Sequence, residues 1–132
     1  DATLDEALKQ EFDMVALPGG LPGADYLNQD QRIQNLIKQM AMGDKFNAAI
    51  CAAPKVLATA GLLDGKRATS FPGILEKMKL KNTTLEADAV VQDGKVITSR
   101  GPGTAMDFAL ILVENLAGIE KRKEVEAGLQ RP

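Results

Sequence analysis

The sequence contains no histidine, no tryptophan and a single cysteine among its 132 residues. Without histidine, the chain by itself forms neither a Ser-His-Asp triad nor a Cys-His pair, and it offers no histidine ligand to a metal. One cysteine is too few for a zinc finger, an iron–sulfur cluster or an intrachain disulfide. The lack of a disulfide framework predicts a reduced intracellular compartment.

Other classes of protein are excluded by what is scarce. A net charge of -2, with only one tyrosine and four phenylalanines, argues against a nucleic-acid partner. No apolar run approaches the roughly 20 residues that cross a bilayer, and the first residues lack the basic start and apolar core of a signal peptide. We therefore expect no membrane partner and one domain over residues 1–132.

Short apolar runs alternate with stretches of helical spacing, which is typical of an α/β domain. Buried strands are predicted at 12–17 and 46–50, a further strand at 66–70, and a hairpin at 89–98 that turns at Asp93-Gly94. Helices are predicted at 30–42, at 52–60, from Thr104 to Gly118, and in a polar tail, with a short helix at 74–80.

Several helix ends carry recognisable signals. Asp30 is suited to cap the start of the helix over 30–42, and Gly43 is suited to stop it. Asp107 stands three residues after Thr104, which is the spacing of a capping box. Lys121 to Lys123 are expected on a solvated helix face.

Cys51 lies where a predicted strand turns into a helix. A helix N-terminus presents unpaired N–H groups and a partial positive charge, which favour the reactive thiolate. The small neighbours Ala52 and Ala53 permit close backbone approach, and Pro54 is tolerated in a first helical turn. A tight strand–turn–helix is a known device for presenting a nucleophile. The alternative is an inert buried cysteine, the commoner use of a lone thiol.

Gly19 and Gly20 follow one predicted parallel strand, as Cys51 follows another. Sites in open α/β sheets gather at the carboxyl ends of strands, so backbone N–H groups of the two turns can together hold an oxyanion. The alternative is that the glycines only form a turn. The run from Gly19 to Gly23 does not have the spacing of a dinucleotide-binding motif.

Arg100 precedes the last long helix. Its guanidinium is suited to bind a carboxylate or phosphate, or to form a structural ion pair with an acidic side chain. The sequence leaves both readings open.

Three segments of the chain together resemble the ThiJ/PfpI superfamily, in the branch of the Parkinson-disease-associated protein deglycase and its bacterial relatives. They are Leu17-Pro18-Gly19-Gly20, then Ala48-Ala49-Ile50-Cys51-Ala52-Ala53-Pro54, then Thr98-Ser99-Arg100-Gly101-Pro102-Gly103-Thr104. The resemblance implies a flavodoxin-like three-layer α/β sandwich with a mostly parallel sheet, which is usually a cytoplasmic homodimer. No metal or organic cofactor is implied.

The resemblance also assigns roles to residues. It implies a nucleophile at Cys51 and oxyanion donors at the backbone N–H groups of Gly20 and Ala52. Around them it implies a pocket formed by Gly19, Leu21, Phe71, Arg100 and Pro102.

The activities implied by the resemblance are a glyoxalase III-type conversion of methylglyoxal to lactate and a related deglycase reaction. The alternative is an oxidative-stress sensor or chaperone that acts through oxidation of Cys51. Ala52 stands where the protease-like branch has a histidine, which argues against a peptidase. Phe71 stands where other members carry a histidine in the 70–72 loop.

Members of this family carry a further β-α-β portion of about fifty to sixty residues before the first strand found here. That portion supplies a glutamate beside the cysteine and part of the dimer interface. The chain begins with Asp1, and we expect it to be a single domain that lacks this portion. Its expected partners are therefore a small dicarbonyl substrate, a second copy and the missing segment. We expect that segment either to be a separate chain of a cleaved protein or to have been lost in preparation.

Overall fold

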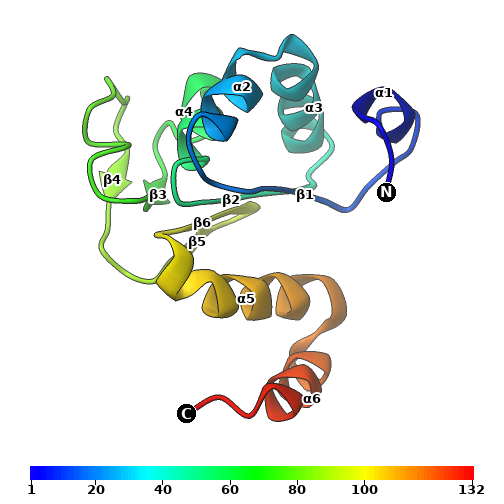
Figure 1. The fold of residues 1–132 in the computed structure, drawn as a ribbon. Helices are drawn as coiled ribbons and strands as arrows, with labels where there is room; N and C mark the ends of the chain where they lie inside the picture. The colour runs from blue at the N-terminus through cyan, green and yellow to red at the C-terminus, as the bar shows by residue number, and fades with distance from the viewer.

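The computed structural model describes residues 1–132 and contains a four-stranded sheet between two helical layers (Figure 1). The strands run in the order β1 (Met14–Leu17), β2 (Phe46–Ile50), β6 (Val96–Ser99) and β5 (Val90–Asp93). β1, β2 and β6 are parallel, and β5 is antiparallel to β6. The predicted α/β sandwich with a mostly parallel sheet is confirmed.

The helices divide unequally between the two faces of the sheet. α2 (Gly23–Gln29), α3 (Gln31–Met42) and α4 (Pro54–Thr59) cover one face, and α5 (Ala105–Ala117) covers the other (Figure 1). α6 (Ile119–Leu129) packs on α5 and extends away from the sheet. The remaining elements are α1 (Leu4–Ala7), the strand pair β3 (Arg67–Ala68) and β4 (Thr84–Leu85), and the 3-10 turn Pro102–Thr104.

The central strand β2 is buried on both faces. Its alanine side chains are small, so the helices on either face can pack close to the strand. Ala48 and Ala49 are fully buried and belong to different core clusters, as successive side chains of a strand point to opposite faces. Ala49 joins the larger cluster with Ile37 and Leu57, and Ala48 contacts the smaller one around Phe108. Each fully buried Leu or Ile contributes about 1.5–3 kcal/mol through loss of apolar surface from water.

α3 forms as its sequence predicts. The Asp30 carboxylate accepts the backbone N–H of Arg32 at the helix start, and Gly43 is the C-cap. Ile33 and Ile37 recur at helical spacing on the buried face. Gln34 is also buried, an exception to the apolar pattern that is explained by its bonding partners at the site below.

The predicted helix at 74–80 is wrong. The segment forms successive turns, in which Ile74 N–H donates to Phe71 O and Met78 N–H donates to Leu75 O. Glu76 turns its carboxylate back to accept the Gly73 N–H. Only Leu75 among residues 74–80 is fully buried, and a helix this short is marginal without a buried face.

Three further predictions were wrong in detail. The strand predicted at 66–70 is confined to β3, because the N–H of Thr69 donates to the Thr98 hydroxyl. The hairpin turns at Gly94-Lys95, one residue later than predicted, with Asp93 still in the ladder. The capping box is absent because Thr104 bonds within the preceding turn and Asp107 instead pairs with Arg131 at 2.8 Å.

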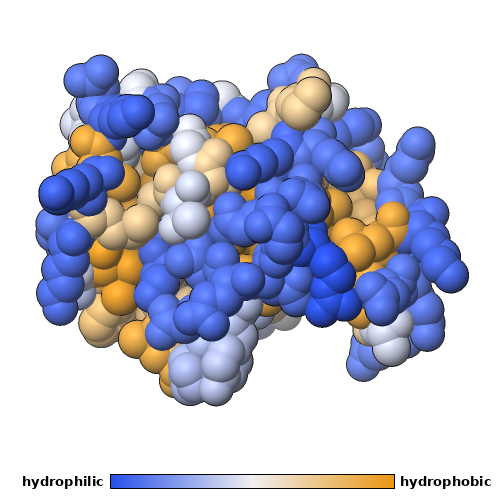
Figure 2. Space-filling model, turned by 90° about the horizontal axis from the view of Figure 1, so that it is seen from above, coloured by the Kyte–Doolittle hydropathy of each residue, from blue (hydrophilic) through white to orange (hydrophobic).

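The polar tail is helical as predicted, and its basic residues pair locally. Lys121 pairs with Glu124, and Arg122 reaches back to Glu114 on α5. The surface above α2, α3 and α4 is mostly hydrophilic, with hydrophobic patches between the charged groups (Figure 2). No helix in the structure combines the length and apolar character needed to cross a bilayer.

The cap of α3 generates a pH-dependent prediction. Arg32 donates to both Asp30 carboxylate oxygens, at 3.1 and 2.7 Å, and this lowers the pKa of Asp30 from 3.8 to about 2. The stabilising effect of this carboxylate is therefore complete above the unfolded-state pKa and is lost as the pH falls through about 2. We expect Arg32→Gln to return the pKa of Asp30 toward 3.8, measured by carbon-13 NMR titration.

The control for this titration is Asp5→Asn, which removes the other carboxylate that Arg32 contacts. It should leave the pKa of Asp30 low. An unchanged Asp30 midpoint in Arg32→Gln would contradict the assignment of the shift to the guanidinium.

Candidate active site at Cys51

Cys51 begins the turn between β2 and α4 and has a left-handed backbone, with φ of 66°. In this left-handed region of the backbone, a residue other than glycine is destabilised by about 1–2 kcal/mol. Two backbone hydrogen bonds hold it there: its N–H donates to Ser99 O at 3.0 Å, and its carbonyl accepts the Phe71 N–H at 2.8 Å. The half-buried thiol thus stands on a strained strand–turn–helix junction, the arrangement of a nucleophile elbow.

Gly19 brings the loop after β1 directly against this elbow. A Cβ at Gly19 would lie 2.5 Å from the Cys51 Cβ and 2.9 Å from Ile50 O, and 3.3 Å from the sulfur. No side chain fits in that space, so glycine is required by the close approach. The loops at the carboxyl ends of β1 and β2 therefore meet at the thiol, as the sequence predicts from parallel strands.

The turns on either side of the thiol contain unpaired amides. The backbone N–H groups of Gly20 and Ala52 donate to no acceptor in the protein, whereas the Ala53 N–H donates to Ile50 O. Gly20 is exposed with φ of 90°, and Ala52 is buried. Because buried N–H groups are almost always paired, the free amide of Ala52 is available to a ligand beside the thiol.

Two side-chain contacts tie together the helices that follow these turns. The Lys55 ammonium donates to Asp25, which joins the first turns of α4 and α2. The buried Gln34 amide donates to Asn28 Oδ1 at 3.1 Å and to Val56 O at 3.3 Å, so that α3 binds both helices. The sequence offered no signal for these contacts, since the partners lie far apart along the chain.

Among the other residues of the predicted pocket, Phe71 bonds the elbow directly, while Leu21 and Pro102 are exposed in the neighbouring loops. Phe71 is bonded to Cys51 through its backbone, and its ring packs on Gly101, where an added Cβ would come within 3.3 Å. Leu21 lies 60% exposed in the loop after Gly20, and Pro102 is exposed at the start of the 3-10 turn. All three side chains are apolar, so none of them supplies an acid or a base.

Arg100 is half-buried and forms no ion pair. Its guanidinium donates to the Thr69 hydroxyl at 3.0 Å and to Glu86 O at 3.4 Å. It therefore braces the segment after β3 against the end of β6.

No side chain of the protein hydrogen-bonds the Cys51 thiol, and none of the three principal cavities includes it. No three potential metal ligands of the histidine, cysteine or carboxylate type gather in the structure. The groups that surround the thiol are backbone amides and small or apolar side chains.

Known proteins share the sequence and the fold of this chain. A family model described as the DJ-1/PfpI family matches residues 1–115. The chain belongs to the DJ-1/PfpI family. It is 43% identical to Drosophila melanogaster DJ-1beta, over 98% of this chain and 69% of that protein. The crystal structure of that relative superposes with a TM-score of 0.91, at 41% identity, over 98% of this chain and 70% of the other.

Other DJ-1 relatives differ in length and in name. The chain is 41% identical to Arabidopsis thaliana protein DJ-1 homolog A over 96% of its own length, but it spans only 33% of that protein. It is 38% identical to a Caenorhabditis elegans protein named glutathione-independent glyoxalase DJR-1.2, over 92% of this chain and 64% of that relative.

The contact between Gly19 and the elbow generates a prediction. Gly19→Ala should destabilise the protein by about 1–3 kcal/mol, because the new methyl group overlaps Cys51 and the backbone of Ile50. It should also change the rate at which iodoacetamide alkylates Cys51. Denaturant unfolding and mass spectrometry measure the two effects.

The matched control is Gly23→Ala, at the first residue of α2. A Cβ there meets no atom within 4 Å, so the variant should unfold and react as the wild type does. Equal behaviour of the two variants would show that the approach of Gly19 to the thiol does not shape the site.

Proposed function

We propose that the protein converts small reactive dicarbonyls such as methylglyoxal to hydroxy acids, with Cys51 as the nucleophile. The observation that carries the proposal is the strained elbow, which places the thiol between two turns whose Gly20 and Ala52 amides are unpaired. The Caenorhabditis elegans relative named as a glutathione-independent glyoxalase supports the same chemistry. The exposed apolar side chains of Leu21 and Phe71, in the loops after β1 and β3, suit a small, uncharged carbonyl compound.

The reaction begins when the Cys51 sulfur adds to the aldehyde carbon and forms a hemithioacetal. The developing oxyanion accepts hydrogen bonds from the Gly20 and Ala52 amides, which are already in place before the reaction. Transfer of a proton from the former aldehyde carbon to the neighbouring carbon, through an enediol, gives a thioester. Water then cleaves the thioester, releases lactate and restores the thiol. The net reaction is the addition of water to methylglyoxal to give lactate, and it needs no external oxidant or reductant.

The proton transfer needs a base, and no carboxylate of this chain hydrogen-bonds the thiol. The family resemblance implies a glutamate from an N-terminal portion, and we propose that such a residue moves the proton. The chain's own contribution is then the nucleophile, its geometry and the oxyanion donors. A histidine base is not needed in this scheme, and no metal or organic cofactor enters it.

The proposal predicts that Cys51→Ser and Cys51→Ala lose nearly all lactate formation from methylglyoxal, by a factor of about a thousand or more. The assay uses the natural full-length protein and measures lactate directly. Met42→Ser, which removes a sulfur atom from an 88% exposed position, is the control and should retain full activity. Equal rates for wild type and Cys51→Ser would overturn the proposal.

A second candidate function is oxidative sensing, which the same amides favour. Two unpaired N–H groups beside the thiol can hold the oxygens of a cysteine sulfinate, the product of oxidation by peroxide. Under mild peroxide, mass spectrometry should then detect a gain of two oxygens at Cys51 before the exposed Met42 gains one. Oxidation of Met42 with Cys51 unchanged would contradict sensing and leave the enzymatic proposal untouched.

A further inference from the structure

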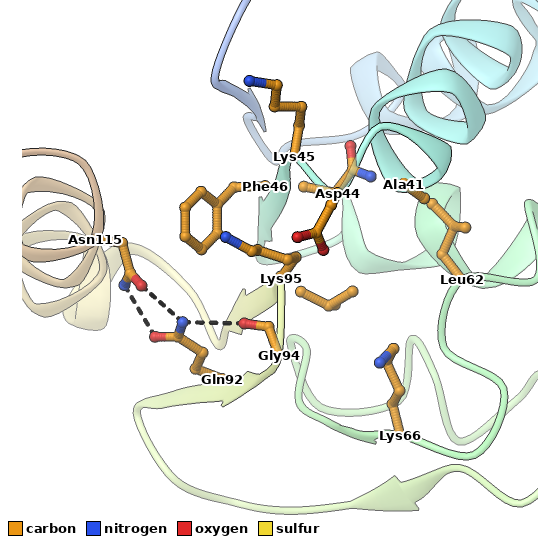
Figure 3. A pocket seen from close by; sticks show the side chains of 12 residues that line it. Ala41, Asp44, Lys45, Phe46, Leu62, Lys66, Gln92, Gly94, Lys95 and Asn115 are labelled. Atoms are coloured by element: carbon orange, nitrogen blue, oxygen red, sulfur yellow. Dashed lines mark hydrogen bonds between the residues drawn. The ribbon is translucent and has the colours of Figure 1, made fainter.

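A second candidate site lies at the opposite end of the sheet from Cys51. A cavity of about 550 Å³ opens at the amino ends of β2 and β6, between the end of α3 and the segment before β3 (Figure 3). Its volume falls in the range of pockets that enclose small ligands, about 300–1,000 Å³. The chemistry of its walls is different from that of the cysteine site, because charged side chains line it.

Two lysines supply free positive charge to this cavity. Lys66 and Lys95 line it and neither forms an ion pair, whereas Lys45 on the same wall pairs with Asp13 at 3.1 Å. Lys95 lies over the Phe46 ring, 4.2 Å from its centre, which orients the ammonium without neutralising it. Lys66 points toward the other lining residues, and Lys45 extends away from them (Figure 3).

Two lining residues carry acceptors without a donor. Asn47 lines the cavity at 2% exposure; its amide donates to Ile37 O at 2.9 Å, and its Oδ1 is buried from solvent without a hydrogen-bond donor. A buried acceptor without a partner is uncommon and needs an explanation. The Asp44 carboxylate is directed among the lining side chains and forms no ion pair (Figure 3).

Gln92 and Asn115 form one rigid wall. Their amides bond each other reciprocally, at 2.8 and 2.9 Å, and Gln92 also donates to Gly94 O. Asn115 also donates to Ile111 O, so the donors of this pair are already used. The side chains of the cavity that remain free to bind a ligand are the ammoniums of Lys66 and Lys95 and the Asp44 carboxylate.

We propose that this cavity binds a small phosphate monoester that carries hydroxyl groups, of the size of a triose or pentose phosphate. A dianionic phosphate suits a cavity that carries two unpaired ammoniums, Lys66 on one side and Lys95 beside Phe46 on the other (Figure 3). Hydroxyl hydrogens of the same ligand match the Asp44 carboxylate, which is exposed and forms no ion pair. The proposal is independent of the reaction at Cys51, because the two sites occupy opposite ends of the strands.

The test uses glycerol 3-phosphate as the probe, with inorganic phosphate and glycerol as comparisons, on the natural full-length protein. Proton–nitrogen NMR titration should give saturable shifts of the amides around Gly94 and Lys66 with glycerol 3-phosphate. Lys66→Gln and Lys95→Gln should each weaken binding by about tenfold, since each removes a charged hydrogen bond. The control Lys79→Gln, at an exposed lysine outside the cavity, should bind as the wild type does.

Asp44→Asn separates recognition of the hydroxyl groups from attraction of an anion. Asp44 has φ of 58°, a conformation that asparagine also tolerates, so the variant should keep its fold. It should lower the preference for glycerol 3-phosphate over inorganic phosphate. The proposal is overturned if glycerol 3-phosphate gives no saturable shift up to about 10 mM. It is also overturned if the wild type binds glycerol 3-phosphate and inorganic phosphate with equal affinity and Asp44→Asn does the same.

Discussion

The backbone conformation of Cys51 is the constraint on which the rest of the site depends. Its left-handed φ is unfavourable locally and persists because Ser99 accepts its N–H and Phe71 donates to its carbonyl. These bonds join β2 to the end of β6 and to the loop after β3. The same turn is closed from a third side by Gly19, which has no side chain to hold the loop after β1 away.

The sheet order makes this junction possible. Three parallel neighbours, β1, β2 and β6, end at one edge, so that three loops from distant parts of the sequence meet there. Alanines on β2 let both helical layers approach the strand, and the Lys55–Asp25 pair and the Gln34 amide fix α2, α3 and α4 relative to one another. Packing of the core thereby determines the separation of the two unpaired amides beside the thiol.

The two ends of the strands present different chemistry. At the carboxyl ends, backbone amides and Gly19 lie beside the cysteine, and no charged side chain hydrogen-bonds the thiol. At the amino ends, lysines, a carboxylate and amide side chains line a cavity. A neutral dicarbonyl suits the first environment and a hydroxylated anion the second. The difference follows largely from the sequence, because Gly19 and Ala52 come shortly after β1 and β2, whereas Asp44, Lys45 and Lys95 come just before β2 and β6. The exception is Arg100, which follows β6 and is bonded to Thr69 and Glu86.

The sequence alone determined the local elements and the identity of the reactive candidate. α3 follows from Asp30, the buried spacing of Ile33 and Ile37, and Gly43, since capping and periodicity are local properties. The position of Cys51 between strand and helix, and the glycines after the first strand, were likewise readable, and the family resemblance added proposed roles for Gly20 and Ala52.

Only the tertiary structure decided what depends on contacts between distant residues. The left-handed φ of Cys51, the 2.5 Å approach at Gly19 and the unpaired Asn47 oxygen have no counterpart in local pattern. The segment 74–80 has helical spacing, yet its turns bend around one buried leucine. Asp107 does not form the predicted cap; its carboxylate instead accepts a hydrogen bond from Arg131, 24 residues away in the sequence. Local propensities contribute less free energy than the hydrogen bonds and packing of the assembled fold. These features therefore could not be predicted from the sequence.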